Sequence, residues 1–85
     1  MAQPPIVVTQ VRQGILGTKI RVHADRSARV RRGSDLGDRV FGLRAGQSLT
    51  LRVRTSHWKV GERLSMNELV NSARDWADIP WDWEL

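Results

Sequence analysis

The chain has 85 residues, a length that supports one domain with a modest core and leaves little room for a large pocket. It contains no cysteine, which excludes disulfides, zinc–thiolate sites and thiol nucleophiles and fits a reducing compartment. Its net charge is +5, no apolar run approaches the roughly 18 residues of a membrane span, and residues 1–5 do not resemble a signal peptide. We therefore expect a cytoplasmic or virion-associated protein with no membrane partner.

Five short stretches read as β-strands in chain order, because they alternate apolar and polar residues or are rich in β-branched ones. They are residues 6–11, 18–23, 28–31, 39–43 and 48–54. Gly14 and Gly17 predict a turn after the first stretch, residues 33–38 predict a loop, and Gly46 predicts another turn. Strands at roughly ten-residue spacing with turns between them predict a small five-stranded barrel.

The hydrophobic period changes from strand-like to helical after residue 63. Ser65 and Glu68 form a capping-box sequence, which predicts the start of a helix. We expect Pro80 to end that helix near residue 79. One helical face is apolar and consists of Leu69, Val70, Ala73, Trp76 and Ala77.

The charges are divided by position along the chain. Residues 1–67 carry thirteen of the fourteen Lys and Arg residues and four of the nine acidic ones, a balance of +9. Residues 68–85 carry one Arg, five acidic residues and three of the four Trp residues, a balance of −4. A basic body followed by an acidic, aromatic tail indicates two surfaces that bind different partners or each other.

Cations recur at two-residue spacing on three of the predicted strands, which places each pair on one face of its strand. If these strands are neighbours, one solvent face gathers six cations, with Arg32 at its edge: Lys19, Arg21, Arg29, Arg31, Arg52 and Arg54. Such a face attracts nucleic acid or another polyanion by counterion release, or an acidic protein surface. The same pattern also fits outward positions that are charged for solubility and to protect sheet edges. Phe41 is the only aromatic residue on the five predicted strands, which disfavours single-strand binding by stacking.

The C-terminal tail is rich in bulky apolar side chains, whose burial is favourable by roughly 25 cal/mol per Å². The candidate partner-binding residues there are Trp76, Ile79, Pro80, Trp81, Trp83 and Leu85. They can close a groove of their own chain, or they can anchor a protein partner, because Trp is a favoured hot-spot residue. In a third alternative the acidic tail folds over the basic face and competes with its ligand.

No pattern in the chain predicts catalysis, a metal site or a cofactor. His23 lies near Asp25 and His57 adjoins Trp58, but neither histidine has the further ligands that a metal site needs. The glycines do not form a phosphate-binding loop, which requires a Lys-Ser or Lys-Thr ending between a strand and a helix. We expect a protein that is not an enzyme.

Four elements of residues 28–60 keep the order of a known family pattern: Val30-Arg31-Arg32-Gly33, Val40-Phe41-Gly42-Leu43, Arg44-Ala45-Gly46-Gln47-Ser48-Leu49-Thr50-Leu51 and Trp58-Lys59-Val60. This part of the chain resembles bacterial Src-homology-3 domains. The resemblance implies a small five-stranded barrel that binds peptides or cell-wall material. The Gly-Trp-Val closing strand usual in that family is missing here, where the predicted helix follows, so the resemblance does not carry the ligand class over.

A rival resemblance rests on Val30-Arg31, Gly42-Leu43, Gly46 and the helix start at residues 64–70. These elements, followed by an acidic Trp-containing tail, are similar to the swapped-hairpin antitoxins of the AbrB type, which implies a DNA-binding regulator. The chain departs from that family in two places. Arg32-Gly33 stands where the family has Ile-Pro, and residues 1–27 exceed its N-terminal region.

These patterns together predict a mainly β, SH3-like fold in one domain: a basic barrel at residues 1–63, a capped helix at 64–79 and an acidic aromatic tail at 80–85. The function we expect is a non-catalytic binding or adaptor module. It would hold a polyanion or an acidic partner on its sheet face and a protein partner through its tail. The alternatives are an assembly subunit that contacts copies of itself, such as a small virion or tail component, and an antitoxin-like DNA-binding regulator.

Overall fold

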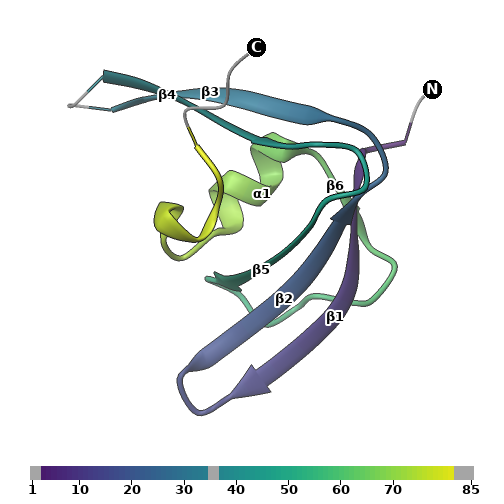
Figure 1. Ribbon diagram of the computed structural model, residues 1–85. Coiled ribbons are helices and arrows are strands. Elements are labelled where there is room, and N and C mark those ends of the chain that lie inside the picture. Colours follow the sequence, from purple (N-terminus) through teal and green to yellow (C-terminus); the bar gives the residue numbers. More distant parts are fainter. Residues whose placement is uncertain (1–2, 35–36, 82–85) are drawn as a thin grey trace.

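The computed structural model describes residues 3–34 and 37–81. It is mainly β, with a curled sheet and one α-helix (Figure 1). Its elements in chain order are β1 (Ile6–Gly14), β2 (Gly17–Ala24), β3 (Ala28–Ser34), β4 (Gly37–Leu43), β5 (Ser48–Val53), β6 (Arg63–Leu64), α1 (Met66–Ser72) and the 3₁₀-helix η1 (Trp76–Asp78). The five predicted strands are all present. β6 was not predicted, because two residues are too few to show a period of two and their partner strand lies near the other end of the chain.

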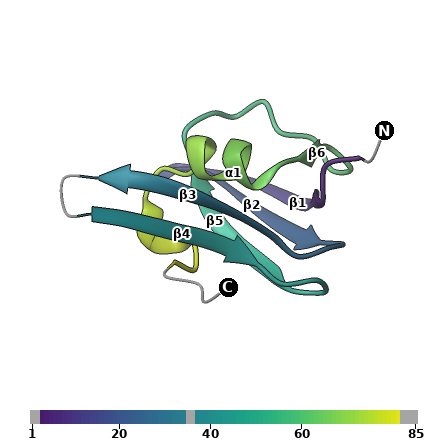
Figure 2. The same ribbon diagram turned by 90° about the horizontal axis from the view of Figure 1, so that it is seen from above.

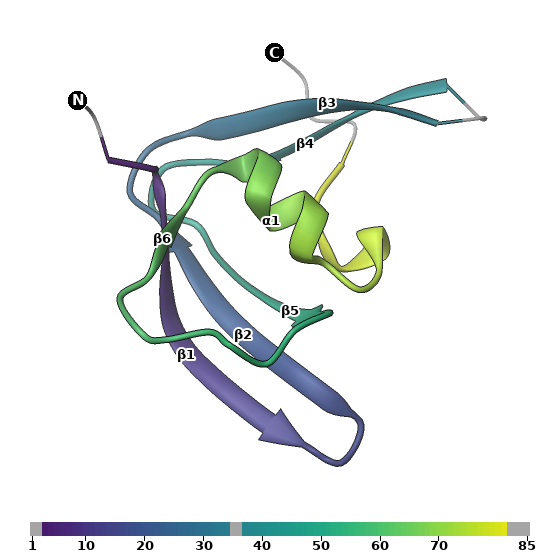
Figure 3. The same ribbon diagram turned by 180° about the vertical axis from the view of Figure 1, so that it is seen from behind.

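Two antiparallel sheets make up the β structure. The larger sheet has the strand order β5-β2-β1-β6, and the smaller one is the β3–β4 hairpin. Figures 1 and 3 show α1 between this hairpin and the larger sheet, and Figure 2 shows the hairpin lying over the strands of the larger sheet. The loop predicted at residues 33–38 is shorter than expected, because Gly33 pairs with Asp38 and Ser34 pairs with Gly37.

One hydrophobic core joins the two sheets to the helical segment. Alternate residues of β2 are buried, as the predicted period of two requires. From the smaller sheet Phe41 and Leu43 are both fully buried, and Leu69 of α1 is equally enclosed. Side chains from both sheets, from α1 and from the C-terminal segment therefore share one hydrophobic cluster. This cluster fixes the position of the C-terminal segment relative to the larger sheet.

A side-chain cap starts α1 where the sequence predicted it. The Ser65 hydroxyl accepts a hydrogen bond from the Glu68 amide at 3.2 Å and donates one to the Glu68 carboxylate at 3.3 Å. Such a cap satisfies an amide that has no partner within the helix. Within the described ranges, no helix has the length and apolar content needed to cross a membrane.

The helix was predicted to continue to about residue 79, but α1 ends at Ser72. Ala73 takes up extended backbone angles (φ −64°, ψ 133°) and pairs with Val53 on the outer edge of β5. Farther along, Trp81 pairs with Phe41 on the edge of β4. Strand edges carry amide and carbonyl groups that need partners. Residues 73–81 supply some of these partners, so tertiary pairing overrides the local helical pattern.

Candidate polyanion-binding site

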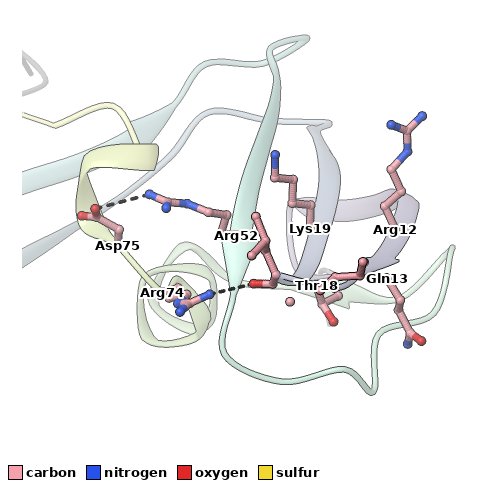
Figure 4. Close-up of a pocket in the computed structure, with 11 residues that line it drawn as sticks. Arg12, Gln13, Thr18, Lys19, Arg52, Arg74 and Asp75 are labelled. Carbon is pink, nitrogen blue, oxygen red and sulfur yellow. Dashed lines mark hydrogen bonds and ion pairs between the residues drawn. The ribbon is translucent and has the colours of Figure 1, made fainter.

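The outer face of the larger sheet carries a row of cations across three strands. Because alternate residues of β2 point into the core, the residues between them point outward. The strand register places Arg12 of β1 opposite Lys19 of β2, and Lys19 opposite Arg52 of β5. Arg21 lies two residues beyond Lys19 on the same face, and Figure 4 shows Arg12 and Lys19 projecting from one side of the sheet. We call Arg12, Lys19, Arg21 and Arg52 the basic face.

A β-bulge places Arg12 on this face. From Ile6 and Val8, which are both buried, a strict period of two would point Gln10 and Arg12 into the core. The register shifts between Val8 and Gln10, and Val11 becomes the next residue on the inner side. Sequence reasoning missed Arg12 because the first strand was expected to end at residue 11 and nothing in the pattern marks the bulge.

Arg52 belongs to the row but is already paired with the acidic C-terminal segment. Its Nε donates to the Asp78 carboxylate at 3.0 Å, and its Nη2 lies 3.4 Å from the Asp75 carboxylate (Figure 4 shows the second contact). The hydrogen bond from Arg52 lowers the pKa of Asp78 below its ordinary value. The same bond, together with the charge of Asp78, raises the pKa of Arg52. The positive charge of Arg52 is thus partly balanced within the chain.

The structure does not bring the six predicted cations onto one sheet surface. Arg29 and Arg31 are exposed on β3, which belongs to the smaller sheet. Arg54 follows β5, and its Nε donates to the Ala73 carbonyl oxygen at 3.2 Å. The expectation failed because the period of two fixes the face within each strand but leaves open which strands are neighbours. Of the six, Lys19, Arg21 and Arg52 share a face, and Arg12 joins them.

Arg32, predicted at the edge of the cationic face, is turned toward α1 instead. Its Nη2 donates to the side-chain oxygens of Asn67 and Asn71, one helical turn apart on α1. The guanidinium group therefore links β3 to the helix. Arg32 is a structural residue in this fold and does not extend the basic face.

No protein-family model, curated protein or solved structure matches the chain.

The predicted partner-binding tail is docked on its own chain as far as it is described. Ile79 is buried at 1% exposure, and Trp76 packs edge-to-face on Phe41 with 5.1 Å between ring centroids. The Pro80 carbonyl oxygen accepts a hydrogen bond from the amide of Gly42 at 3.2 Å. These contacts correspond to the first of the three alternatives for the tail, in which the side chains close a groove of the same chain.

Trp81 is the most exposed of the described tail residues that were predicted to bind a partner. Its side chain keeps 45% exposure, and the Arg39 guanidinium lies 4.1 Å from its ring centroid in a cation–π contact. Trp83 and Leu85, also predicted to bind a partner, lie outside the described residues.

A hollow of about 920 Å³ adjoins the basic face where β1 turns into β2 (Figure 4). It is bounded by the turn, the end of β5 and the start of the C-terminal segment. Three basic side chains other than that of Arg52 line it: Arg12, Lys19 and Arg74. A negatively charged group would therefore find cations on more than one side of this hollow.

His23 and the nearby Asp25 make contacts within the fold. His23 Nδ1 shares a hydrogen bond with the Ser48 hydroxyl at 3.1 Å, and Asp25 forms an ion pair with Arg63 at 2.7 Å. In the part of the chain that the structure describes, no group of three or more His, Asp or Glu side chains is placed to hold a metal ion.

Proposed function

We propose that this protein is a small non-catalytic binding module whose basic face holds double-stranded nucleic acid. One observation carries the proposal: the side chains of Arg12, Lys19 and Arg21 extend from two paired strands, and these side chains form neither an ion pair nor a hydrogen bond with any described residue. The three charges lie close together on the solvent side of the larger sheet, and the charge of Lys19 also helps to lower the pKa of Asp78. A polyanion would gain from this arrangement by releasing the counterions that surround its phosphates.

The number of solvated cations sets the expected salt dependence. Each phosphate neutralised on a duplex contributes about −0.9 to the slope of log affinity against log salt, so three contacts give a slope of about −2.7. Affinity should then fall about 40-fold between 50 and 200 mM salt. Arg52 adds little to this value, because Asp78 already neutralises much of its charge.

The surroundings of the basic face favour a duplex over a single strand. Single-strand binding normally combines a cationic groove with aromatic side chains on which bases stack. Trp81, the exposed aromatic residue of the described chain, lies beside Arg39 at the edge of the smaller sheet and not on the basic face. The basic face offers cations without stacking platforms, an arrangement suited to phosphate contacts.

The experiment is a salt titration of duplex binding by fluorescence anisotropy, with a labelled 20-base-pair DNA. Arg12→Ala, Lys19→Ala and Arg21→Ala should each reduce the slope by about 0.9 and weaken binding to unrelated sequences equally. Arg31→Ala is the matched control, because it removes the same charge from the smaller sheet and should leave the slope unchanged. Binding that does not depend on salt, or equal effects of Arg21→Ala and Arg31→Ala, would rule out this site.

We propose in addition that the two sheets form an SH3-like barrel, as the resemblance of residues 28–60 implies. The support is a single core to which the curled larger sheet, the β3–β4 hairpin and α1 all contribute buried side chains. An experimental structure in which β3 and β4 continue the curl of the larger sheet would test this architecture.

A further inference from the structure

The turn between β1 and β2 carries two fully exposed aliphatic side chains. Ile15 and Leu16 occupy the two positions between Gly14 and Gly17, with exposures of 104% and 89%. Two-residue hairpin turns favour Gly, Asn and Asp, whose backbone conformations fit the turn. Two branched aliphatic residues at this point contribute neither turn chemistry nor core packing, so folding does not account for their presence.

Two hydrogen bonds join this end of the hairpin to other parts of the chain. Arg74 Nη1 donates a hydrogen bond to the Leu16 carbonyl oxygen at 3.0 Å. On the other strand, Gln13 Nε2 donates to the Ser56 carbonyl oxygen at 3.1 Å. The backbone of the tip is therefore held at Leu16 and, one residue before the turn glycine, at Gln13, which lowers the entropic cost of inserting the tip into a ligand.

Cations lie behind the tip at a distance that suits a groove of nucleic acid. Arg12 and Lys19 are directly opposite each other, and each is three residues, or about 10 Å, from the tip. The minor groove of a duplex is about 7.5 Å deep. When Ile15 and Leu16 reach its floor, the long side chains of Arg12 and Lys19 are at the level of the phosphates.

We propose that Ile15 and Leu16 form an apolar wedge that enters the minor groove of a duplex and opens a base step, while Arg12, Lys19 and Arg74 contact the flanking phosphates. The inference rests on the proposed function and adds the mode of binding to it. Aliphatic wedges that partly unstack a base step bend the duplex by about 20–90°. A bent duplex then wraps more of the protein surface.

The cations behind the tip favour a duplex as the occupant. Arg12 and Lys19 lie next to the tip and also belong to the basic face, so a duplex held on that face comes within reach of Ile15 and Leu16. An anionic membrane surface is the alternative that the second arm of the test decides.

The test measures bending and binding separately. A 20-base-pair duplex with a central flexible TA step and a fluorophore at each end reports bending by energy transfer. We expect the wild-type protein to bend it. The double variant Ile15→Ser/Leu16→Ser should lose the bend, bind within about tenfold of wild type and keep the same salt slope. Both side chains are exposed, so the variant should keep the wild-type Tm. Val60→Ser is the control, because it removes a 66% exposed aliphatic side chain away from the tip and should bend the duplex like wild type.

The outcomes separate this inference from the proposed function. Failure of the wild-type protein to bind the duplex at low salt overturns both. Salt-dependent binding without bending, or equal bending by the wild type and the double variant, overturns the wedge and leaves the proposed function standing. Vesicles containing anionic phosphatidylserine form the second arm. Vesicle binding that is lost in the double variant, combined with an unbent duplex, assigns the tip to a membrane surface and overturns the wedge.

Discussion

The Asp78 carboxylate accepts hydrogen bonds from two parts of Arg52, the main-chain amide at 3.1 Å and the guanidinium Nε at 3.0 Å. The first bond satisfies an amide on the open edge of β5, and the second balances a cation of the basic face. The Asp78 side chain thus supplies a partner for an amide on the edge of β5 and reduces the positive charge of the basic face. The division of the chain into a basic body and an acidic tail has a physical consequence here, because the two meet within one molecule.

Removing the Asp78 carboxylate should destabilise the protein and strengthen duplex binding. Asp78→Ala loses the hydrogen bonds to Arg52, a cost of about 1 kcal/mol for a partly exposed side chain, or about 4–8 °C in Tm. It also removes the closer of the two acidic partners of Arg52, leaving Asp75 at 3.4 Å, so the salt slope of binding should become steeper by up to about 0.9. Thermal melts and anisotropy titrations measure the two effects. Asp38→Ala is the matched control, because it makes the same change in net charge at an exposed site of β4. Equal salt slopes for the two variants would contradict the prediction.

The same contact predicts a loss of stability in acid. The pKa of Asp78 is lowered in the folded protein, chiefly by the hydrogen bond from Arg52. Its stabilising contribution is therefore fully present above the unfolded pKa of about 3.9 and is lost as the pH falls through the folded value. The difference in Tm between wild type and Asp78→Asn should be constant from about pH 5 to 7 and should shrink below about pH 4. A Tm difference that does not change down to pH 2 would show that protonation of the Asp78 carboxylate is not linked to folding.

Removing Arg31 and removing Arg32, which are neighbours on β3, should have different effects on stability. Arg32→Ala breaks the side-chain hydrogen bonds to Asn67 and Asn71 of α1, so it should cost about 1–2 kcal/mol and leave the salt slope of duplex binding unchanged. Arg31→Ala removes an exposed side chain one residue earlier and should change stability by no more than about 0.5 kcal/mol. Urea denaturation of both variants provides the measurement. Equal midpoints would mean that Arg32 does not link β3 to the helix.

The sequence was sufficient to locate the strands but not to assemble the basic face. Alternation on β2 correctly predicted that Lys19 and Arg21 point outward, because a half-buried strand has a strict period of two. Whether Arg29 and Arg31 share that face depends on which strands pair, and pairing over long separations leaves no local signal. Arg12 required knowledge of a bulge, which reverses the face of every residue after it.

Tertiary pairing also explains the error at the C-terminal helix. Ala73 and Trp76 fit a continuous helical stripe, and the cap at Ser65 was predicted correctly. The stripe does not show that the open edge of β5 lies within reach of Ala73 and pairs with it. The resemblance of residues 28–60 to bacterial Src-homology-3 domains stays a prediction, since it rests on short elements made of common residues.

The docking of the tail on its own chain predicts a strong contrast between two apolar positions that are two residues apart. Ile79→Ala leaves a cavity at a site with 1% exposure and should cost about 2–5 kcal/mol. Trp81→Ala removes a 45% exposed ring and one cation–π contact with Arg39, so it should cost about 1 kcal/mol or less. Urea denaturation of the purified protein, without any partner present, measures both values. If Ile79→Ala were as stable as wild type, the tail would not be packed in the free protein, and its apolar residues would again be candidates for binding a partner.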